Sequence, residues 1–215
     1  MSRRLGWLGP AIVAVGAAIA AVGVWYAVSA RPTPGDVIDT ITLDPHRSVV
    51  IRAEQGGPRS FVELITDGSM TWQALIPAYA GAANKRGVAW NEFALSIRVI
   101  RGDRAEVFAL SFRDSTKLGG VILASGRGPI DRTATGPLTL TDHVRSYELV
   151  AGTGWHVLVA VDLQSGKRAW DIDIDLGADP VDDAVLEGDT IWVTQSGTRR
   201  GWNTRTGQPT ITNQL

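Results

Sequence analysis

The sequence predicts an all-β domain made of about four repeated units, preceded by one apolar segment near the N-terminus. From residue 46 onward almost every apolar run is short and is bounded by Gly, Asp, Asn or Ser, as in strands separated by turns. No convincing amphipathic helix follows the apolar segment. In addition, one hairpin pattern recurs along the chain. Strands this short and this evenly spaced indicate a β-sandwich, a barrel or a propeller.

Residues 1–30 predict a transmembrane anchor. Residues 5–30 contain no charged side chain and are long enough to cross a bilayer as a helix. Arg3 and Arg4 precede this span, so the positive-inside rule places the N-terminus in the cytoplasm. A signal peptide cleaved after Ala30 is the alternative, but the apolar run is longer than such peptides require. We therefore expect a single-pass protein of the inner (cytoplasmic) membrane with a periplasmic C-terminal domain.

A linker is expected at 31–45 and the β domain at 46–215. Pro32, Pro34 and Gly35 prevent the preceding helix from continuing, although the alternation at 37–43 is compatible with an early strand. Loops are expected at 77–87 and 125–137. Strands are expected at 48–52, 60–65, 70–76, 88–90, 93–100, 105–112, 119–124, 138–140, 147–150, 156–163, 169–174, 182–186 and 190–194, with a last unit at 202–210.

The repeated hairpin is clearest at 159–170, where Asp162, Gly166 and Trp170 mark a strand, a turn and a second strand. The residues corresponding to Gly166 are Gly68, Ser115 and Gly207, so the reference positions are spaced by 47, 51 and 41 residues. Gly68 is followed by Trp72, and Gly207 is preceded by Asn203 in the place of Asp162. Periods of about 40–50 residues with a few strands each are typical of propeller blades.

This pattern resembles the blade repeat of pyrroloquinoline-quinone-type β-propellers, which reads roughly Ala-x-Asp-x-x-Thr-Gly-Lys-x-x-Trp. The match is good at 160–170, fair at 203–207 and poor around Ser115. The resemblance implies a small or incomplete propeller of about four blades, in which Gly forms the turn, Asp or Asn bonds to its backbone and Trp packs between blades. A closed four-bladed ring, a propeller completed by a partner and a distorted sandwich all remain open.

Composition limits the possible functions. The formal net charge is −1, which argues against a nucleic-acid-binding surface. The absence of Cys excludes disulfides, thiolate metal sites and a cysteine nucleophile. His46, His143 and His156 form no closely spaced metal-binding pair, and no nucleophile elbow, zinc-protease motif or phosphate-binding loop occurs. The prediction is therefore a protein without enzymatic activity and without a required cofactor.

One acidic run is a weak candidate for a metal site. Its members are Asp171, Asp173, Asp175, Asp179 and Asp182, which have the spacing of positions 1, 3, 5, 9 and 12 of a Ca²⁺ loop. The glycine expected at position 6 is Leu176. Alternation with Ile172 and Ile174 instead favours a strand with one solvated face, which protects a sheet edge.

The leading functional hypothesis is a membrane-anchored interaction or scaffold module within an envelope complex. It follows from the anchor and the repeat, and it implies an envelope protein as partner. The resembled family also includes cofactor-dependent dehydrogenases, which use a larger propeller, a Ca²⁺-bound quinone and often a disulfide between adjacent Cys residues. A quinone- or Ca²⁺-dependent enzyme or its accessory subunit is therefore one alternative, and a small-ligand sensor domain is another.

Overall fold

The computed structural model describes residues 31–77, 79, 87–113, 117–130, 139–176 and 179–210. The chain divides into two units, Met1–Thr33 and Pro34–Leu215, of which the second contains all the strands below. No helix among the described residues is long and apolar enough to cross a membrane. The predicted span at 5–30 lies outside these residues, so the anchor stays a prediction.

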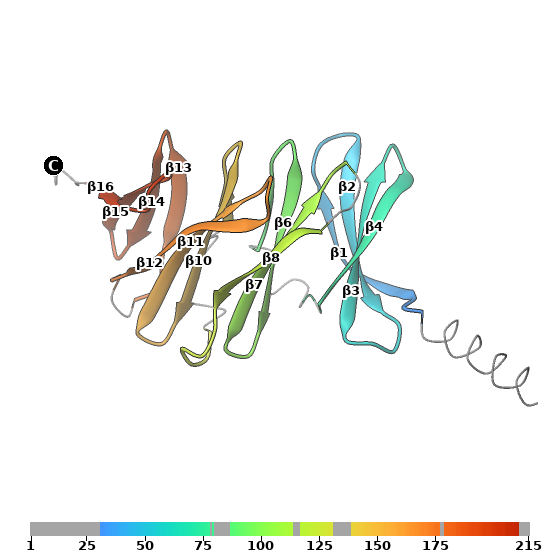
Figure 1. Cartoon of the computed structure of the whole chain (residues 1–215), viewed down its shortest axis with the longest axis horizontal. Coiled ribbons are helices and arrows are strands. Elements are labelled where there is room, and N and C mark those ends of the chain that lie inside the picture. The colour runs from blue at the N-terminus through green and yellow to red at the C-terminus, as the bar shows by residue number, and fades with distance from the viewer. Residues whose placement is uncertain are drawn as a thin grey trace, which may run out of the picture. The chain divides into compact units, whose positions relative to one another are not determined.

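The described residues of the second unit form sixteen strands in four separate four-stranded sheets (Figure 1). The first sheet contains β1 (Pro34–Thr42), β2 (Arg47–Glu54), β3 (Arg59–Thr66) and β4 (Ser69–Pro77). The second contains β5 (Val88–Trp90), β6 (Ala94–Arg101), β7 (Arg104–Ser111) and β8 (Lys117–Ala124). The third contains β9 (Thr139–Thr141), β10 (Arg145–Gly152), β11 (Trp155–Asp162) and β12 (Lys167–Ile174). The fourth contains β13 (Asp183–Glu187), β14 (Thr190–Gln195), β15 (Thr198–Asn203) and β16 (Pro209–Thr210).

Each sheet is an antiparallel meander in which strand order follows chain order. The first and third hairpins of a sheet therefore lie at one end, which we call the turn end, and the second hairpin lies at the opposite end. The first strands of the second, third and fourth sheets contact one another, β5 with β9 and β9 with β13. This arrangement is the one expected for propeller blades, and it shows that the distorted-sandwich alternative is wrong.

Apolar side chains fill the three junctions between consecutive sheets. Val49 and Ile51 of β2 pack with Leu95 and Ile97 of β6 between the first and second sheets. Between the second and third sheets the cluster is rich in valine, and between the third and fourth it includes Tyr147, Trp170 and Trp202. Both faces of β6, β10 and β11 are buried as a result.

The expected boundary of the β domain at residue 46 is corrected by β1. This strand runs from Pro34 to Thr42 and pairs with β2, so most of the predicted linker at 31–45 belongs to the first sheet. Apolar Ile38 and Ile41 explain the difference, because they pack against the core between the first and second sheets. The predicted loops at 77–87 and 125–137 lie partly outside the described residues.

Candidate functional site

The repeat residues predicted from the sequence lie in the last hairpin of each sheet. Gly68, Gly166 and Gly207 sit in the β3–β4, β11–β12 and β15–β16 turns, with φ of 78°, 64° and 71°. Only glycine adopts such φ values without strain. Ser115, the degenerate member, falls between β7 and β8 but lies outside the described residues. The repeat therefore marks corresponding turns in the first, third and fourth sheets.

Asp162 and Asn203 hold their turns through side-chain acceptors. The Asp162 carboxylate accepts hydrogen bonds from the amide and the hydroxyl of Ser165, both at 2.7 Å. Asn203 Oδ1 accepts equivalent bonds from the Thr206 amide at 3.1 Å and hydroxyl at 3.2 Å. Partial burial raises the pKa of Asp162, but the Ser165 bonds outweigh it and hold that pKa below its usual value. Both side chains therefore accept hydrogen bonds within their own turns.

Trp72 and Trp170 each pack against the neighbouring sheet. The indole N–H of Trp72 in the first sheet donates to the Phe112 carbonyl of the second sheet at 3.1 Å. The indole N–H of Trp170 in the third sheet donates to the Thr204 carbonyl of the fourth at 2.9 Å. Phe112 and Thr204 each lie three residues before a reference position, so these two bonds are structurally equivalent.

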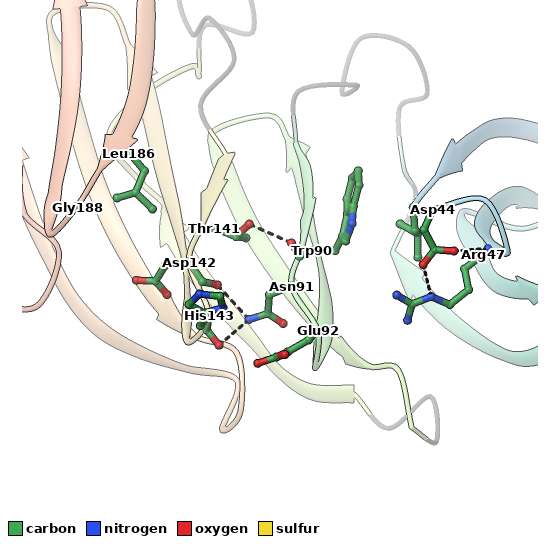
Figure 2. A pocket seen from close by; sticks show the side chains of 11 residues that line it. Asp44, Arg47, Trp90, Asn91, Glu92, Thr141, Asp142, His143, Leu186 and Gly188 are labelled. Atoms are coloured by element: carbon green, nitrogen blue, oxygen red, sulfur yellow. Dashed lines mark hydrogen bonds and ion pairs between the residues drawn. The ribbon is translucent and has the colours of Figure 1, made fainter.

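A hollow of about 700 Å³, which we call the central hollow, opens at the turn end and is lined by the first hairpin of all four sheets (Figure 2). Three of these hairpins contain the same kind of turn. Asp44, Asn91 and Asp142 each accept backbone hydrogen bonds from the residues two and three positions later, at 2.6 to 3.0 Å. The fourth hairpin contributes Leu186 and Gly188. The hollow is therefore built from repeated turns that side chains hold rigid.

The polar groups of the hollow also hold the sheets together. Asn91 of the second sheet donates to the carbonyls of Asp142 and His143 in the third sheet, at 3.2 and 3.1 Å. The Thr141 hydroxyl returns a bond to the Trp90 carbonyl at 3.0 Å. Figure 2 shows these bonds on adjacent hairpins. They fix the second and third hairpins relative to each other.

Some ionisable groups at the hollow are held in hydrogen bonds, and others are exposed to solvent. Arg47 Nε donates to Asp44 Oδ2 at 2.6 Å, and this bond lowers the pKa of the Asp44 carboxyl. The Tyr147 hydroxyl donates to the Asp142 carboxylate; burial of Tyr147, together with this bond, raises the pKa of the phenol. Glu92 and His143, in contrast, are exposed at the mouth of the hollow. They are the ionisable side chains of the lining that are most open to solvent.

A buried charged pair lies between the second and third sheets. Glu148 is fully buried, and Arg98 Nη1 lies 3.6 Å from its carboxylate and donates to the Leu149 carbonyl at 3.0 Å. The hydroxyls of Ser96, Ser146 and Thr139 donate to the same carboxylate at 3.3, 2.6 and 2.7 Å. Burial raises the pKa of Glu148 and lowers that of Arg98, while their mutual attraction opposes both shifts.

The acidic run does not converge on one point. Asp171 pairs with Arg168 at 3.1 Å, Asp173 pairs with Arg127, and Asp179 accepts a bond from Ser196 at 2.9 Å. Asp182 is exposed before β13. Across the part of the chain that the structure describes, no group of three or more Asp, Glu or His side chains could hold a metal ion. Ca²⁺ binding, and the enzyme alternative that depends on it, stay predictions.

Asp173 and Asp175 instead line a second hollow, of about 640 Å³, at the end opposite the turn end. His156 and Arg127 line it as well. Burial lowers the pKa of His156. His46 bonds through Nδ1 to Asp67 at 2.9 Å, and His143 borders the hollow at the turn end.

The first-hairpin turns and the buried pair were missed by sequence reasoning. Asp44, Asn91 and Asp142 are spaced by 47 and 51 residues, which matches the first two spacings of the glycine repeat. Comparing positions at this offset would have found them. Arg98 and Glu148 had no such signal, because a charged residue in an alternating strand is ordinarily solvated.

Comparisons with known proteins show the fold. No family model matches the chain, and no curated protein matches it. Among solved structures, BamB from Moraxella catarrhalis is 15% identical over 80% of this chain and 47% of its own, with a TM-score of 0.43. Hsv2 from Kluyveromyces lactis is 13% identical over 81% of this chain and 50% of its own, with a TM-score of 0.48.

A europium-containing methanol dehydrogenase is the one of these three structures with a TM-score above 0.5. It is 13% identical over 84% of this chain and 42% of its own, with a TM-score of 0.52. This chain thus spans half or less of the length of these three proteins. At such low identity the likeness bears on the fold alone. The four meandering sheets therefore have a β-propeller-type fold.

Proposed function

We propose that this chain is a membrane-anchored, extracytoplasmic propeller-type domain that acts as a protein-interaction or scaffold module. The observation that carries the proposal is the turn end, where the first hairpins of all four sheets border one hollow. A single partner segment in this hollow would contact every sheet. Rigid turns that present side chains on a scaffold are a common basis for binding sites.

The side chains at the turn end support recognition of a protein segment. Phe93, in the β5–β6 turn, is 45% exposed and lines a neighbouring hollow of about 460 Å³. Glu92 borders both hollows, and His143 lies at the mouth of the larger one. Exposed aromatic and charged groups around a concave surface are features of protein-binding sites. The expected partner is an envelope protein, since the anchor places this domain outside an inner membrane.

Affinity purification of the full chain after crosslinking in intact cells and detergent extraction tests the proposal. Phe93→Asp should lower recovery of the crosslinked partner more than tenfold, because it places a charge in the apolar part of the binding surface. Ile122→Asp is the matched control, since Ile122 belongs to the same sheet, is 38% exposed and lies on the outer strand β8. Equal recovery with both variants, or equal loss, would contradict a partner at the turn end.

A small-ligand sensor is the second candidate. The size of the central hollow favours it, since small-molecule sites commonly measure about 300–1,000 Å³. A screen of small anionic and cationic metabolites should then find one that raises the melting temperature of the full chain. Glu92→Gln together with His143→Ala should abolish that rise. A ligand whose effect survives this double change binds elsewhere.

A further inference from the structure

The first and fourth sheets each have one face without a neighbouring sheet among the described residues. In the first sheet, Val49 and Ile51 point toward the second sheet, so alternation places Ser48, Val50 and Arg52 on the opposite face. In the fourth sheet, Ile191 and Val193 point toward the third sheet. Trp192 therefore lies on the opposite face. We call these two faces the leading face of the first sheet and the trailing face of the fourth.

The trailing face is partly apolar. Val185, Trp192 and Gly201 are in register across β13, β14 and β15. A Cβ atom at Gly201 would come within 2.8 Å of the Trp192 ring, so the absence of a side chain lets the indole lie across the sheet. The Arg199 guanidinium stacks on the same indole, 4.6 Å from the ring centroid. A flat indole on a sheet face is suited to packing against another sheet.

The two faces are the two halves of one further junction. Every junction in the chain joins the trailing face of one sheet to the leading face of the next. Within the chain, Ser96 on a trailing face meets Ser146 on a leading face, at 3.1 Å between hydroxyls. The free trailing face of the fourth sheet could pack on the free leading face of a first sheet in the same way.

Register gives the residues that would meet. In the fourth sheet Leu186 pairs with Ile191, and Trp192 is the next residue of that strand. In the second sheet Trp90 pairs with Leu95, and Ser96 is the next residue. Leu186 and Trp90 both line the central hollow, so Trp192 and Ser96 are equivalent. On the other side, Ser48 and Val50 lie four and six residues after Asp44, as Ser146 and Glu148 do after Asp142. Trp192 would thus meet a small residue and an apolar one.

We propose that two copies of this chain join head to tail, each trailing face packing on the leading face of the other copy, to close a ring of eight sheets. The likeness to the methanol dehydrogenase agrees with this. The aligned part is 42% of that chain, so that chain is long enough to hold a second set of four such sheets. A head-to-tail contact that closes after two copies gives a symmetric dimer.

Closure by a second copy also completes the central hollow. Its present wall consists of the first hairpins of four sheets, and the partner copy would supply the remaining wall with the same residues. The two-fold axis runs along the axis of the ring, so both turn ends lie on one side. Both copies of Pro34, where the β domain begins, then emerge at the same level, which lets two anchors enter one membrane.

Cysteine crosslinking of the full chain in detergent tests the contact directly. The natural chain contains no Cys, so a variant with Ser48→Cys and Trp192→Cys has only the two introduced thiols. Mild oxidation should convert most of it to a covalent dimer. A variant with Ser48→Cys and Val144→Cys is the control, because Val144 is 41% exposed but lies in the β9–β10 turn; it should stay monomeric. Equal crosslinking of both, crosslinking within one chain or none would overturn the proposal.

Sedimentation of the same detergent-solubilised chain provides the second measurement. The natural chain should sediment as a dimer, and Trp192→Asp should raise its dissociation constant more than tenfold with an unchanged melting temperature of the monomer. Ile122→Asp should remain dimeric. A monomeric natural chain, including one in which residues 1–33 cover the leading face, would overturn the proposal, as would any assembly larger than a dimer.

Discussion

Neighbouring sheets of this domain are joined in two different ways. Where the first sheet meets the second, and the third meets the fourth, a tryptophan indole donates to a carbonyl of the following sheet. An arginine accompanies each bond, with Arg47 over the Phe112 ring at 5.3 Å and Arg145 donating to the Thr204 carbonyl at 2.9 Å. Large side chains thus tie these two junctions at the turn end.

The junction between the second and third sheets uses small residues at the same places. Gly119 stands where the tryptophan is expected, and a Cβ atom there would overlap the Gly166 carbonyl. Ala94 stands in place of the arginine and packs with Ala109 and Leu163. The backbones approach closely at this junction, and the buried pair of Arg98 and Glu148 lies within it. The same repeat therefore forms junctions of two kinds: one is joined by large Trp and Arg side chains, and the other by close contact between backbones.

The largest predicted effect concerns the buried pair of Arg98 and Glu148 at the junction between the second and third sheets. Glu148→Ala leaves Arg98 charged and unpaired in the interior, so the free energy of unfolding should fall by about 3–5 kcal/mol. Urea denaturation followed by circular dichroism measures it. Replacing both partners, with Arg98→Met and Glu148→Leu, should recover most of the loss, because no buried charge remains.

The control for that experiment is an exposed pair. Glu187→Gln removes the partner of Arg199 on the fourth sheet and should leave the unfolding curve unchanged, since both side chains are about half exposed. If the double replacement at Arg98 and Glu148 is as unstable as Glu148→Ala alone, the unpaired charge of Arg98 is not the cause of the loss.

Two substitutions at Trp72, which is 8% exposed, test how the tryptophans stabilise the junctions between sheets. Trp72→Ala removes a buried indole and should lower the free energy of unfolding by about 3 kcal/mol. Trp72→Phe keeps most of the apolar area but loses the N–H bond to the Phe112 carbonyl, so its loss should be about 1 kcal/mol. No loss in Trp72→Phe would show that the hydrogen bond contributes nothing, and equal losses in the two variants would show that the buried apolar area contributes nothing. Urea denaturation under the same conditions gives both values.

The backbones are in close contact at the junction between the second and third sheets, so adding one methyl group there should lower the free energy of unfolding, though by less than Trp72→Ala does. Gly119→Ala must separate two backbones and should lower the free energy of unfolding by about 1–3 kcal/mol. Gly152→Ala is the matched control, since the atoms nearest to its Cβ position belong to the Trp155 side chain and not to a backbone. Thermal melts of the two variants compare them. A greater loss at Gly152 would show that the junction is not close-packed.

These differences show which features a sequence can predict. Turn residues are local, so Gly68, Gly166 and Gly207 predicted their hairpins, and the short apolar runs predicted nearly every strand. The resemblance at Trp72 and Trp170 implied that these rings lie between sheets, and large apolar rings are generally buried. The strand β1 was placed mostly in a linker, because its apolar residues acquire a core only from the second sheet.

The central hollow could be predicted only in part, and the buried pair not at all. Asp44, Asn91 and Asp142 repeat at the glycine spacing, but the fourth sheet replaces this turn with Gly188 and Asp189, which hides the pattern. Arg98 and Glu148 lie on different sheets, and nothing local distinguishes them from solvated charges. Asp173 similarly acquires its partner, Arg127, only through the packing of the second sheet on the third.

The smallest predicted effect concerns acid stability at the two equivalent turns held by Asp162 and Asn203. Because folding lowers the pKa of Asp162, its contribution to stability is fully present above the ordinary value of 3.8 and is lost as the pH falls toward its lower folded value. Asp162→Asn keeps the acceptor that Asn203 uses naturally, so the melting temperature should change little at neutral pH and fall less steeply below about pH 4. Asn203→Asp should do the reverse and steepen the acid limb. Melting curves recorded across this pH range check both, and parallel acid limbs for all three proteins would mean that the carboxylate at position 162 has no special role.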